Sequence, residues 1–312
     1  MSEPTWASRG RRVVRVTDRI FDVVILTLIL LLIAFALFAL WDTEQVRFAA
    51  DPTRYQIYRP TYEDSVSFDE LRAINPDVFA WLTVYGTNID YPVVQGPDNE
   101  KYINTNAYGH YSLPGSIFMD AENDRSFRDF NSILYGHHME KSVMFGDIGC
   151  FCEKEYFDMH RYGNLFFDGT DHGLEFFAFV RTTAYNRTLL NAGITGQAAR
   201  QQYLDWIYEN ALVSRDIGVT PEDHILLMTT CSAEATNGRD ILIARITDTT
   251  FENPYATEET PMTGWPYLFE QVEHYRICLI PLALMLVLIA LTLLVLSRKR
   301  TKKREELPDV LA

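Results

Sequence analysis

A cysteine and an arginine stand at the ends of two apolar segments, where they could act together. The run 225–230 (Ile-Leu-Leu-Met-Thr-Thr) leads into Cys231, and Arg239 precedes the next apolar run, 241–246. The residues between them, Ser-Ala-Glu-Ala-Thr-Asn-Gly, favour a turn. Two strands joined by a short loop are neighbours in a sheet, so this spacing places Cys231 beside Arg239. Taken singly, each also fits a role as a buried structural cysteine or a surface arginine.

Two histidines follow a third apolar segment. His137 and His138 come directly after the run 131–135 and Gly136. A cysteine thiol has a pKa of about 8.5 and is mostly protonated at neutral pH, whereas its thiolate is the nucleophile. A histidine could handle that proton, and a cation such as Arg239 could stabilise an oxyanion. Physical chemistry permits this combination but does not require it, since a histidine is more often structural.

The elements that would position these residues are mostly strands. Short apolar runs separated by Gly, Pro and Asn-Asp pairs predict strands, whereas longer runs with helical spacing predict helices. We expect strands at 79–84, 91–94, 115–119, 132–135, 164–168, 174–182, 224–230 and 240–247, and helices at 67–74, 144–160 and 197–211.

The other cysteines do not form a recognisable site. Cys150 and Cys152 are two residues apart, which is poor spacing for a disulfide between them, and Cys278 lies in an apolar run. No Cys-x-x-Cys or Cys/His metal spacing is present, so the sequence predicts no metal and no cofactor. Cys150 and Cys152 are interpreted as packing residues.

Charge excludes one class of partner. The formal net charge is −14, and the stretch from Asp42 to Tyr275 holds 16 Lys and Arg against 36 Asp and Glu, a difference of −20. Nucleic-acid binding needs a basic surface, so this segment is not expected to bind nucleic acid.

Two uncharged apolar runs are long enough to cross a membrane as helices. Val23–Trp41 has 19 residues and Ile277–Leu296 has 20. The alternatives are a buried core helix for either run and a cleaved signal peptide for the first, which is longer than a usual signal core. Arginines precede the first run and a Lys/Arg cluster at 298–304 follows the second. Basic flanks stay cytoplasmic, so both termini are predicted inside and the segment between the runs outside.

Several stretches of the chain resemble the class B sortases, a family of cysteine transpeptidases, over roughly residues 66–248. The likeness begins in the stretches 74–82 (Ile-Asn-Pro-Asp-Val-Phe-Ala-Trp-Leu), 86–96 (Gly-Thr-Asn-Ile-Asp-Tyr-Pro-Val-Val-Gln-Gly), 98–103 (Asp-Asn-Glu-Lys-Tyr-Ile) and 115–120 (Gly-Ser-Ile-Phe-Met-Asp). It continues through the histidine segment, the Thr-Cys strand end and the Arg that follows.

The resemblance implies a mostly-β fold, an eight-stranded barrel with inserted helices, and the two apolar runs predict a membrane helix on either side of it. It implies Cys231 as nucleophile, His137 as acid and base, with His138 the weaker choice, and Arg239 as oxyanion and substrate support. By position it also implies four groove residues: Asn99, Ile103, Tyr135 and Thr229. The expected segments are a tail (1–22), a membrane helix (23–41), a stalk (42–65), the catalytic domain (66–250), a linker (251–276), a second membrane helix (277–296) and a basic tail (297–312).

The resemblance also implies a reaction and its partners. Sortases of Gram-positive bacteria cleave a C-terminal sorting signal on exported proteins and pass the acyl part to an amine, usually of a peptidoglycan precursor. The second apolar run is unusual for class B and resembles pilin-polymerising sortases, whose acceptor is a pilin lysine. Asp51-Pro52 only weakly matches the lid signature of those enzymes. A cysteine peptidase and a non-catalytic binding module remain as alternatives.

Overall fold

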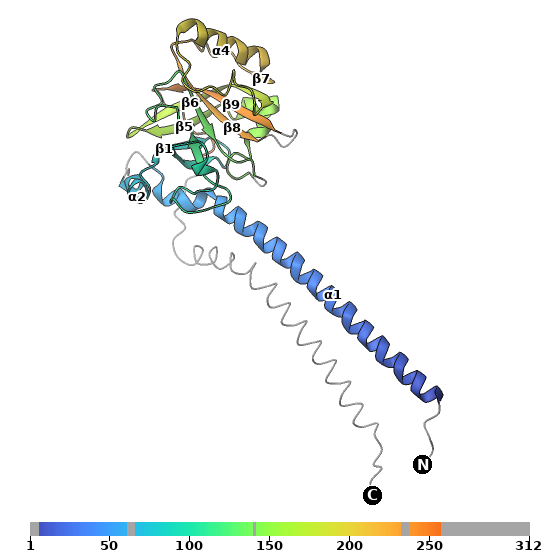
Figure 1. Cartoon of the computed structure of the whole chain (residues 1–312). Coiled ribbons are helices and arrows are strands. Elements are labelled where there is room, and N and C mark those ends of the chain that lie inside the picture. Colours follow the sequence, from blue (N-terminus) through green and yellow to red (C-terminus); the bar gives the residue numbers. More distant parts are fainter. Residues whose placement is uncertain (1–5, 61–65, 140–141, 232–236, 257–312) are drawn as a thin grey trace. The chain divides into compact units, whose positions relative to one another are not determined.

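The computed structural model describes residues 6–60, 66–139, 142–231 and 237–256. The chain divides into two compact units, Met1–Gln45 with Thr260–Ala312, and Val46–Glu259. The first unit contains most of a long helix, α1 (Trp6–Ala50) (Figure 1).

Helix α1 contains the first predicted membrane run. In the described part of the chain it is the one helix long and apolar enough to cross a membrane. The run 23–41 has a single hydroxyl side chain, Thr27, which donates to the Val23 carbonyl oxygen at 2.7 Å. A polar group satisfied within its own helix suits a lipid environment, where no water is available to pair with it. The second predicted run, Ile277–Leu296, lies outside the described residues.

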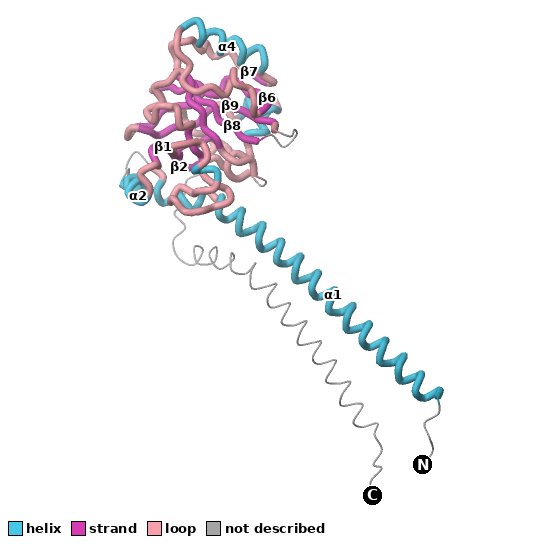
Figure 2. The backbone as a smooth tube through the Cα atoms, viewed as in Figure 1, coloured by secondary structure: helices cyan, strands magenta, loops and turns pink. Residues whose placement is uncertain are grey.

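The second unit is built around a closed β-barrel. Its sheet runs β5-β1-β2-β3-β4-β8-β9-β6-β7, and β5 also pairs with β6, which closes eight strands into a ring and leaves β7 on the outside. The strands, drawn in magenta, lie together in the folded part of the chain in Figure 2. The strands are β1 (Val78–Val84), β2 (Asp90–Val94), β3 (Ile117–Met119), β4 (Asn131–Tyr135), β5 (Tyr162–Phe167), β6 (Thr170–Thr183), β7 (Val213–Ser214), β8 (His224–Cys231) and β9 (Gly238–Thr247).

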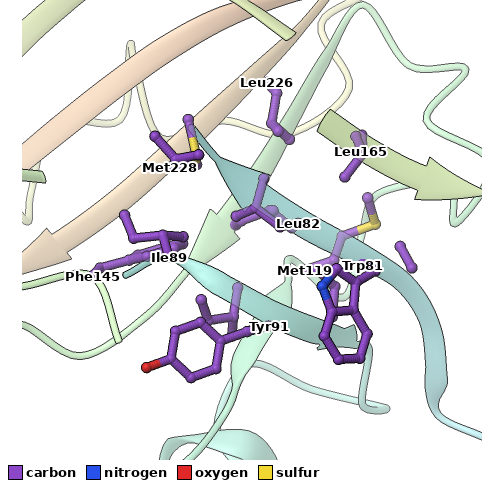
Figure 3. Close-up of a cluster of buried hydrophobic side chains, with 14 of the residues drawn as sticks. Trp81, Leu82, Ile89, Tyr91, Met119, Phe145, Leu165, Leu226 and Met228 are labelled. Atoms are coloured by element: carbon purple, nitrogen blue, oxygen red, sulfur yellow. The ribbon is translucent and has the colours of Figure 1, made fainter. Parts of the chain in front are cut away.

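The barrel interior is filled by side chains from strands that are far apart in the sequence. Leu82 of β1, Leu165 of β5, and Leu226 and Met228 of β8 are fully buried and converge there (Figure 3). Alternate residues of a strand point to opposite faces, so the neighbours of these side chains face outward. The interior of the barrel is therefore a packed apolar core.

A second apolar layer covers part of the outer face. The odd-numbered residues of β8, Ile225 and Leu227, pack with Ile241 and Ile243 of β9 against helix α4 (Gln197–Asn210). Helix α4 buries Tyr203, Leu204 and Ile207 in this layer.

The N-terminal part of the unit is docked on the barrel. The predicted stalk contains the end of α1 and a 3-10 helix, η1 (Pro52–Tyr58), whose Tyr55 is buried. The Tyr91 hydroxyl donates to the Ala50 carbonyl oxygen at 2.8 Å. Helix α2 (Val66–Ile74) inserts Phe68 against two barrel aromatics, Trp81 and Phe166.

The predicted helix at 144–160 is wrong as one element. The structure instead has a 3-10 helix, η3 (Ile148–Cys152), followed by α3 (Lys154–Met159). Backbone N–H groups of the expected first helical turn donate to other segments. The Met144 N–H donates to the Tyr91 hydroxyl at 2.9 Å, and the Phe145 N–H donates to the His137 carbonyl at 3.0 Å. Met144 has a φ of 53°, which no α-helix contains.

The remaining architecture matches the sequence-based expectation. The mostly-β fold and the eight-stranded barrel are confirmed, and the helices predicted at 67–74 and 197–211 correspond to α2 and α4 within one residue at each end. The two-residue strand β7 and the short 3-10 helix η2 (Lys101–Ile103) were not predicted.

Candidate active site

Three strand termini meet at one rim of the barrel. Strands β4 and β8 are parallel, with Tyr135 opposite Thr229, so their C-terminal ends lie together. Strand β9 is antiparallel to β8, and Cys231 is the register partner of Arg239. The Gly136 N–H continues the β4–β8 pairing by donating to the Thr229 carbonyl at 3.2 Å. Parallel and antiparallel pairing together bring residues from three distant segments to the same edge.

Cys231 is the last residue of β8. Its backbone position is described, whereas its side chain and residues 232–236 are not. Thr229, two residues earlier, therefore lies on the same face of the strand, and Thr230 points the other way.

His137 is two residues beyond the end of β4 and is only partly buried. Its Nε2 lies 3.0 Å from the carbonyl oxygen of Ile103 in η2. A carbonyl can only accept, so this contact assigns the proton to Nε2 and leaves Nδ1 as the nitrogen that can exchange a proton. Two of the predicted site residues, His137 and Ile103, are thereby in direct contact.

His138 is placed differently from its neighbour. It forms an isolated β-bridge with Met144, and its Nδ1 is buried without a hydrogen-bond partner among the described atoms. Its backbone is tied into the loop that leads away from the rim. The geometry therefore favours His137 over His138 for proton transfer.

Arg239 is half-buried at the start of β9. One of its guanidinium nitrogens donates to the Gly238 carbonyl oxygen at 3.2 Å. The guanidinium is also close enough to Tyr135 to lower the pKa of that phenol. Burial and the Asp120 carboxylate outweigh it, so the pKa of Tyr135 is raised well above its ordinary value. Arg239 and Tyr135 therefore share one electrostatic environment.

Three side chains form a hydrogen-bonded chain on the β3–β4 side of this rim. The Tyr135 hydroxyl and the Asn99 Nδ2 each donate to Oδ2 of Asp120, both at 2.9 Å. The Tyr135 ring is stacked on Phe118 of β3, with centroids 5.3 Å apart. Asn99 and Tyr135 were predicted groove residues, whereas Asp120 was not, although it ends the stretch 115–120 that carries the family likeness.

Thr229 lies on the floor of the same region. It is 1% exposed, and its Oγ1 is buried without a hydrogen-bond partner among the described atoms. It is the register partner of both Tyr135 and Ile241. A buried hydroxyl without a partner is uncommon and is a candidate contact for a ligand.

The two other described cysteines, Cys150 and Cys152, lie in η3, and no disulfide joins them. His160, at the C-terminal end of α3, is stacked on Tyr156 and Tyr255. No group of three His, Cys, Asp or Glu that could hold a metal occurs among the residues the structure describes.

No known family model matches this chain. The chain is 30% identical over 165 residues to sortase B of Listeria monocytogenes, covering 53% of this chain and 67% of the relative. It is 28% identical over 199 residues to sortase B of Staphylococcus aureus, covering 62% of this chain and 80% of the relative.

Solved structures agree with these relatives. A sortase B from the type II pilus of Streptococcus pneumoniae is 46% identical, with a TM-score of 0.52, over 58% of this chain and 99% of that one. A class B sortase of Streptococcus pyogenes involved in pilus biogenesis is 39% identical, with a TM-score of 0.54, over 58% and 98%.

A closed eight-stranded barrel with a cysteine ending one strand at its rim defines the class of protein. The chain belongs to the class B sortases, which are cysteine transpeptidases. The predicted family is thus confirmed.

Proposed function

We propose that this protein is a membrane-anchored transpeptidase that cleaves a C-terminal sorting signal through a thioester on Cys231 and transfers the acyl part to an amine. One observation carries the proposal: the strand pairing sets Cys231 opposite Arg239 and brings the end of β4, which leads into His137, to the same rim. The nucleophile, acid/base group and cation required for acyl transfer then lie at one place.

The first half-reaction forms the thioester. The Cys231 thiolate attacks the carbonyl carbon of the scissile peptide bond, and the oxyanion that forms is stabilised by Arg239 and backbone N–H groups. Protonated His137 keeps its Nε2–H on the Ile103 carbonyl and gives its Nδ1 proton to the departing amine. The C–N bond breaks, and the acyl group stays on sulfur.

The second half-reaction reverses these roles. An amine attacks the thioester carbonyl, His137 Nδ1 takes its proton, and the C–S bond breaks to release the thiolate. The free energy of the cleaved peptide bond is carried by the thioester, so this scheme uses no nucleotide, metal or other cofactor.

Two amines are candidate acceptors. The first is an amine of a peptidoglycan precursor, which would anchor surface proteins to the cell wall. The second is a lysine of a pilin. Sequence identity supports the pilin lysine as a candidate acceptor. The pilus-associated proteins of Streptococcus pneumoniae and Streptococcus pyogenes are 46% and 39% identical to this chain, whereas sortase B of Staphylococcus aureus is 28% identical.

We further propose that both apolar runs anchor the protein, with both termini cytoplasmic and the catalytic domain (66–250) outside. Helix α1 and its internally satisfied Thr27 support the first anchor. The second anchor, Ile277–Leu296, rests on its uncharged sequence and on the basic cluster that follows it. Labelling of single cysteines introduced on either side of each run, in intact cells, tests this topology.

The activity is tested with the full-length protein in detergent and a library of sorting-signal peptides. Mass spectrometry should detect an acyl adduct on Cys231 that disappears in Cys231→Ala. Cys150→Ala is the matched control, because Cys150 is a free, exposed thiol in η3 and should not affect the adduct. Wild-type turnover in Cys231→Ala would refute the assigned nucleophile.

The acceptor is tested by adding a peptidoglycan-type amine and a lysine-bearing pilin peptide in competition. Transfer to either amine separates a transpeptidase from a cysteine peptidase, for which water is the acceptor. A protein that binds the peptides but forms no adduct with any of them would be a binding module.

A further inference from the structure

Four exposed apolar side chains lie in the part of the chain that includes the end of α1, and together they are named the apolar patch. Phe48 belongs to α1 and Ile57 to η1, and Tyr111 and Leu113 lie in the loop 104–114 between η2 and β3. Ile57 is 72% exposed, Tyr111 76% and Leu113 54%. Single exposed apolar residues are ordinary, whereas a group of them on one surface marks an interaction site.

Aromatic contacts hold these segments together as one surface. Tyr108 of the loop is stacked on Tyr55, with ring centroids 5.1 Å apart, and it meets Tyr58 edge-on at 6.1 Å. The Tyr108 hydroxyl donates to the Arg54 carbonyl oxygen at 2.9 Å. The Arg54 guanidinium in turn lies 5.0 Å from the centroid of the Phe48 ring. The loop, η1 and the end of α1 are therefore neighbours.

The loop is closed by its own hydrogen bonds. Thr105 pairs with Tyr111 in an isolated antiparallel β-bridge, and the Asn106 N–H donates to the His110 carbonyl oxygen at 2.8 Å. The Asn106 Oδ1 accepts from the N–H groups of Tyr108 and His110, at 3.1 and 3.0 Å. Tyr111 is thus presented to solvent by a backbone that is already ordered. Such a surface loses little conformational entropy when it binds a partner.

Charge distinguishes these segments from the rest of the acidic chain. Residues 102–119 contain no Asp, Glu, Lys or Arg, and residues 46–60 contain three Arg against one Asp, a difference of +2. The whole segment 42–275 has a difference of −20. An anionic lipid surface attracts arginines and repels carboxylates. The apolar patch therefore belongs to stretches that carry none of the negative excess.

Chain length keeps the apolar patch close to the predicted membrane run. That run ends at Trp41, and Phe48 follows seven residues later. Both residues belong to α1, and seven residues of α-helix rise about 10 Å. Even a fully extended chain of this length would span no more than about 25 Å. Because the headgroup layer beside the hydrocarbon core is itself about 5–8 Å thick, Phe48 is within reach of the lipid headgroups.

We propose that the apolar patch docks on the outer surface of an anionic lipid bilayer, with its apolar side chains among the headgroups and Arg54 paired with lipid phosphates. This inference rests on the proposed membrane anchoring by α1. Aromatic side chains are favoured at this depth, and arginine pairs well with phosphate. The loop follows Ile103, whose carbonyl oxygen lies 3.0 Å from His137 Nε2. Docking of the patch therefore fixes how the active-site rim is turned toward the membrane.

Nitroxide labels on single cysteines measure the depth of the apolar patch. The full-length protein, with its four native cysteines replaced by Ala, is placed in liposomes that contain phosphatidylglycerol. Ile57→Cys, Tyr111→Cys or Leu113→Cys then supplies the one labelled site. Electron paramagnetic resonance compares collisions of the label with oxygen, which concentrates in lipid, and with a water-soluble nickel complex. We expect all three labels to collide more with oxygen and less with nickel than a label at a control site.

The matched control is Leu212→Cys. Leu212 is 57% exposed, about as much as Leu113, and it directly precedes β7. Strand β7 and α4 lie at the opposite end of the folded unit from α2, which contacts η1 (Figure 1). A label at Leu212 should therefore stay accessible to nickel. Tyr111→Asp combined with Leu113→Asp should return the label at Ile57 to water, because anionic headgroups repel carboxylates.

Nickel accessibility at the three patch labels equal to that at Leu212 overturns the inference. So does a label at Ile57 that is unchanged by the two aspartates. Protein that does not float with the liposomes would instead contradict the proposed anchoring by α1. Thioester formation on Cys231 of the wild-type protein tests the catalytic proposal separately.

Discussion

Gly115 supports the carbonyl that orients His137, so a methyl group added there should damage the site from a distance. Gly115 has a φ of 62°, and a Cβ at this position would clash with the carbonyl oxygens of Ile103 and Tyr102. Both contacts are with backbone, which cannot rotate away as a side chain can. The Ile103 oxygen is the one that faces His137 Nε2 at 3.0 Å.

The expected loss has two parts. A non-glycine residue at positive φ costs about 1 kcal/mol. Displacing the Tyr102 and Ile103 carbonyls adds about 2 kcal/mol, as for an overpacked site. The total of about 3 kcal/mol should lower the melting temperature of a domain of this size by about 6–12 °C. The shift of the Ile103 carbonyl should also reduce kcat/KM by about tenfold or more, because the imidazole is misplaced.

A second glycine in the same loop provides the control. Gly109 has a φ of 82°, but a Cβ there meets nothing within 4 Å. Gly109→Ala should therefore show only the cost of positive φ, about 1 kcal/mol, with kcat/KM unchanged. Thermal unfolding by circular dichroism and peptide turnover measured on both variants separate backbone strain from displacement of the carbonyl.

The reasoning fails if Gly115→Ala and Gly109→Ala behave alike in both assays. The link between this carbonyl and catalysis fails if Gly115→Ala is destabilised as expected but keeps the wild-type kcat/KM. In that case the Ile103 carbonyl does not orient the catalytic imidazole.

Three further predictions concern stability. Arg181→Met should lower the free energy of unfolding, measured in urea, by about 3–5 kcal/mol, because it leaves Asp240 buried without its ion-pair partner at 2.6 Å. The double variant with Asp240→Leu should recover most of this loss. An equal loss in the double variant would contradict this account. Burial is the largest single influence on the pKa of Asp77 and raises it, but the hydrogen bonds from Lys101 and Tyr102 and the charges of Lys101 and Arg125 together outweigh burial, so the net pKa is lowered. The stabilisation from Asp77 is therefore full above about pH 4 and is lost as pH falls further. Asp77→Asn should flatten that acid limb in pH-dependent melting curves, and parallel curves would argue against it. Phe176→Ala should cost about 3–5 kcal/mol by opening a cavity in the barrel, measured by chemical denaturation, and a loss below 1 kcal/mol would show that the core collapses around it.

The positions of most strands along the chain and the pairing of Cys231 with Arg239 were accessible from the sequence. A turn-forming segment between two apolar runs specifies neighbouring strands, and this local rule needs no knowledge of the rest of the fold. The barrel followed from the family likeness, because closure depends on the pairing of β5 with β6 and of β1 with β5, and no local pattern shows those pairings.

The segment 144–160 shows where local reasoning failed. Its composition is compatible with one helix, but the Tyr91 hydroxyl and the His137 carbonyl take the N–H groups of Met144 and Phe145. These partners lie in other parts of the chain. Tertiary contacts therefore overrode the helical preference, as they often do for short segments.

The sequence by itself determined the residue types available for acyl transfer, the apolar runs that suit a membrane, and the strands that end at Cys231 and begin near Arg239. Only the tertiary structure decided that His137 faces the Ile103 carbonyl and that Asp120 joins Tyr135 to Asn99. The physical reason is range. Strand and turn preferences act over a few neighbouring residues, whereas each of these hydrogen bonds requires two segments, 15 to 34 residues apart, to be held within 3 Å by the folded barrel.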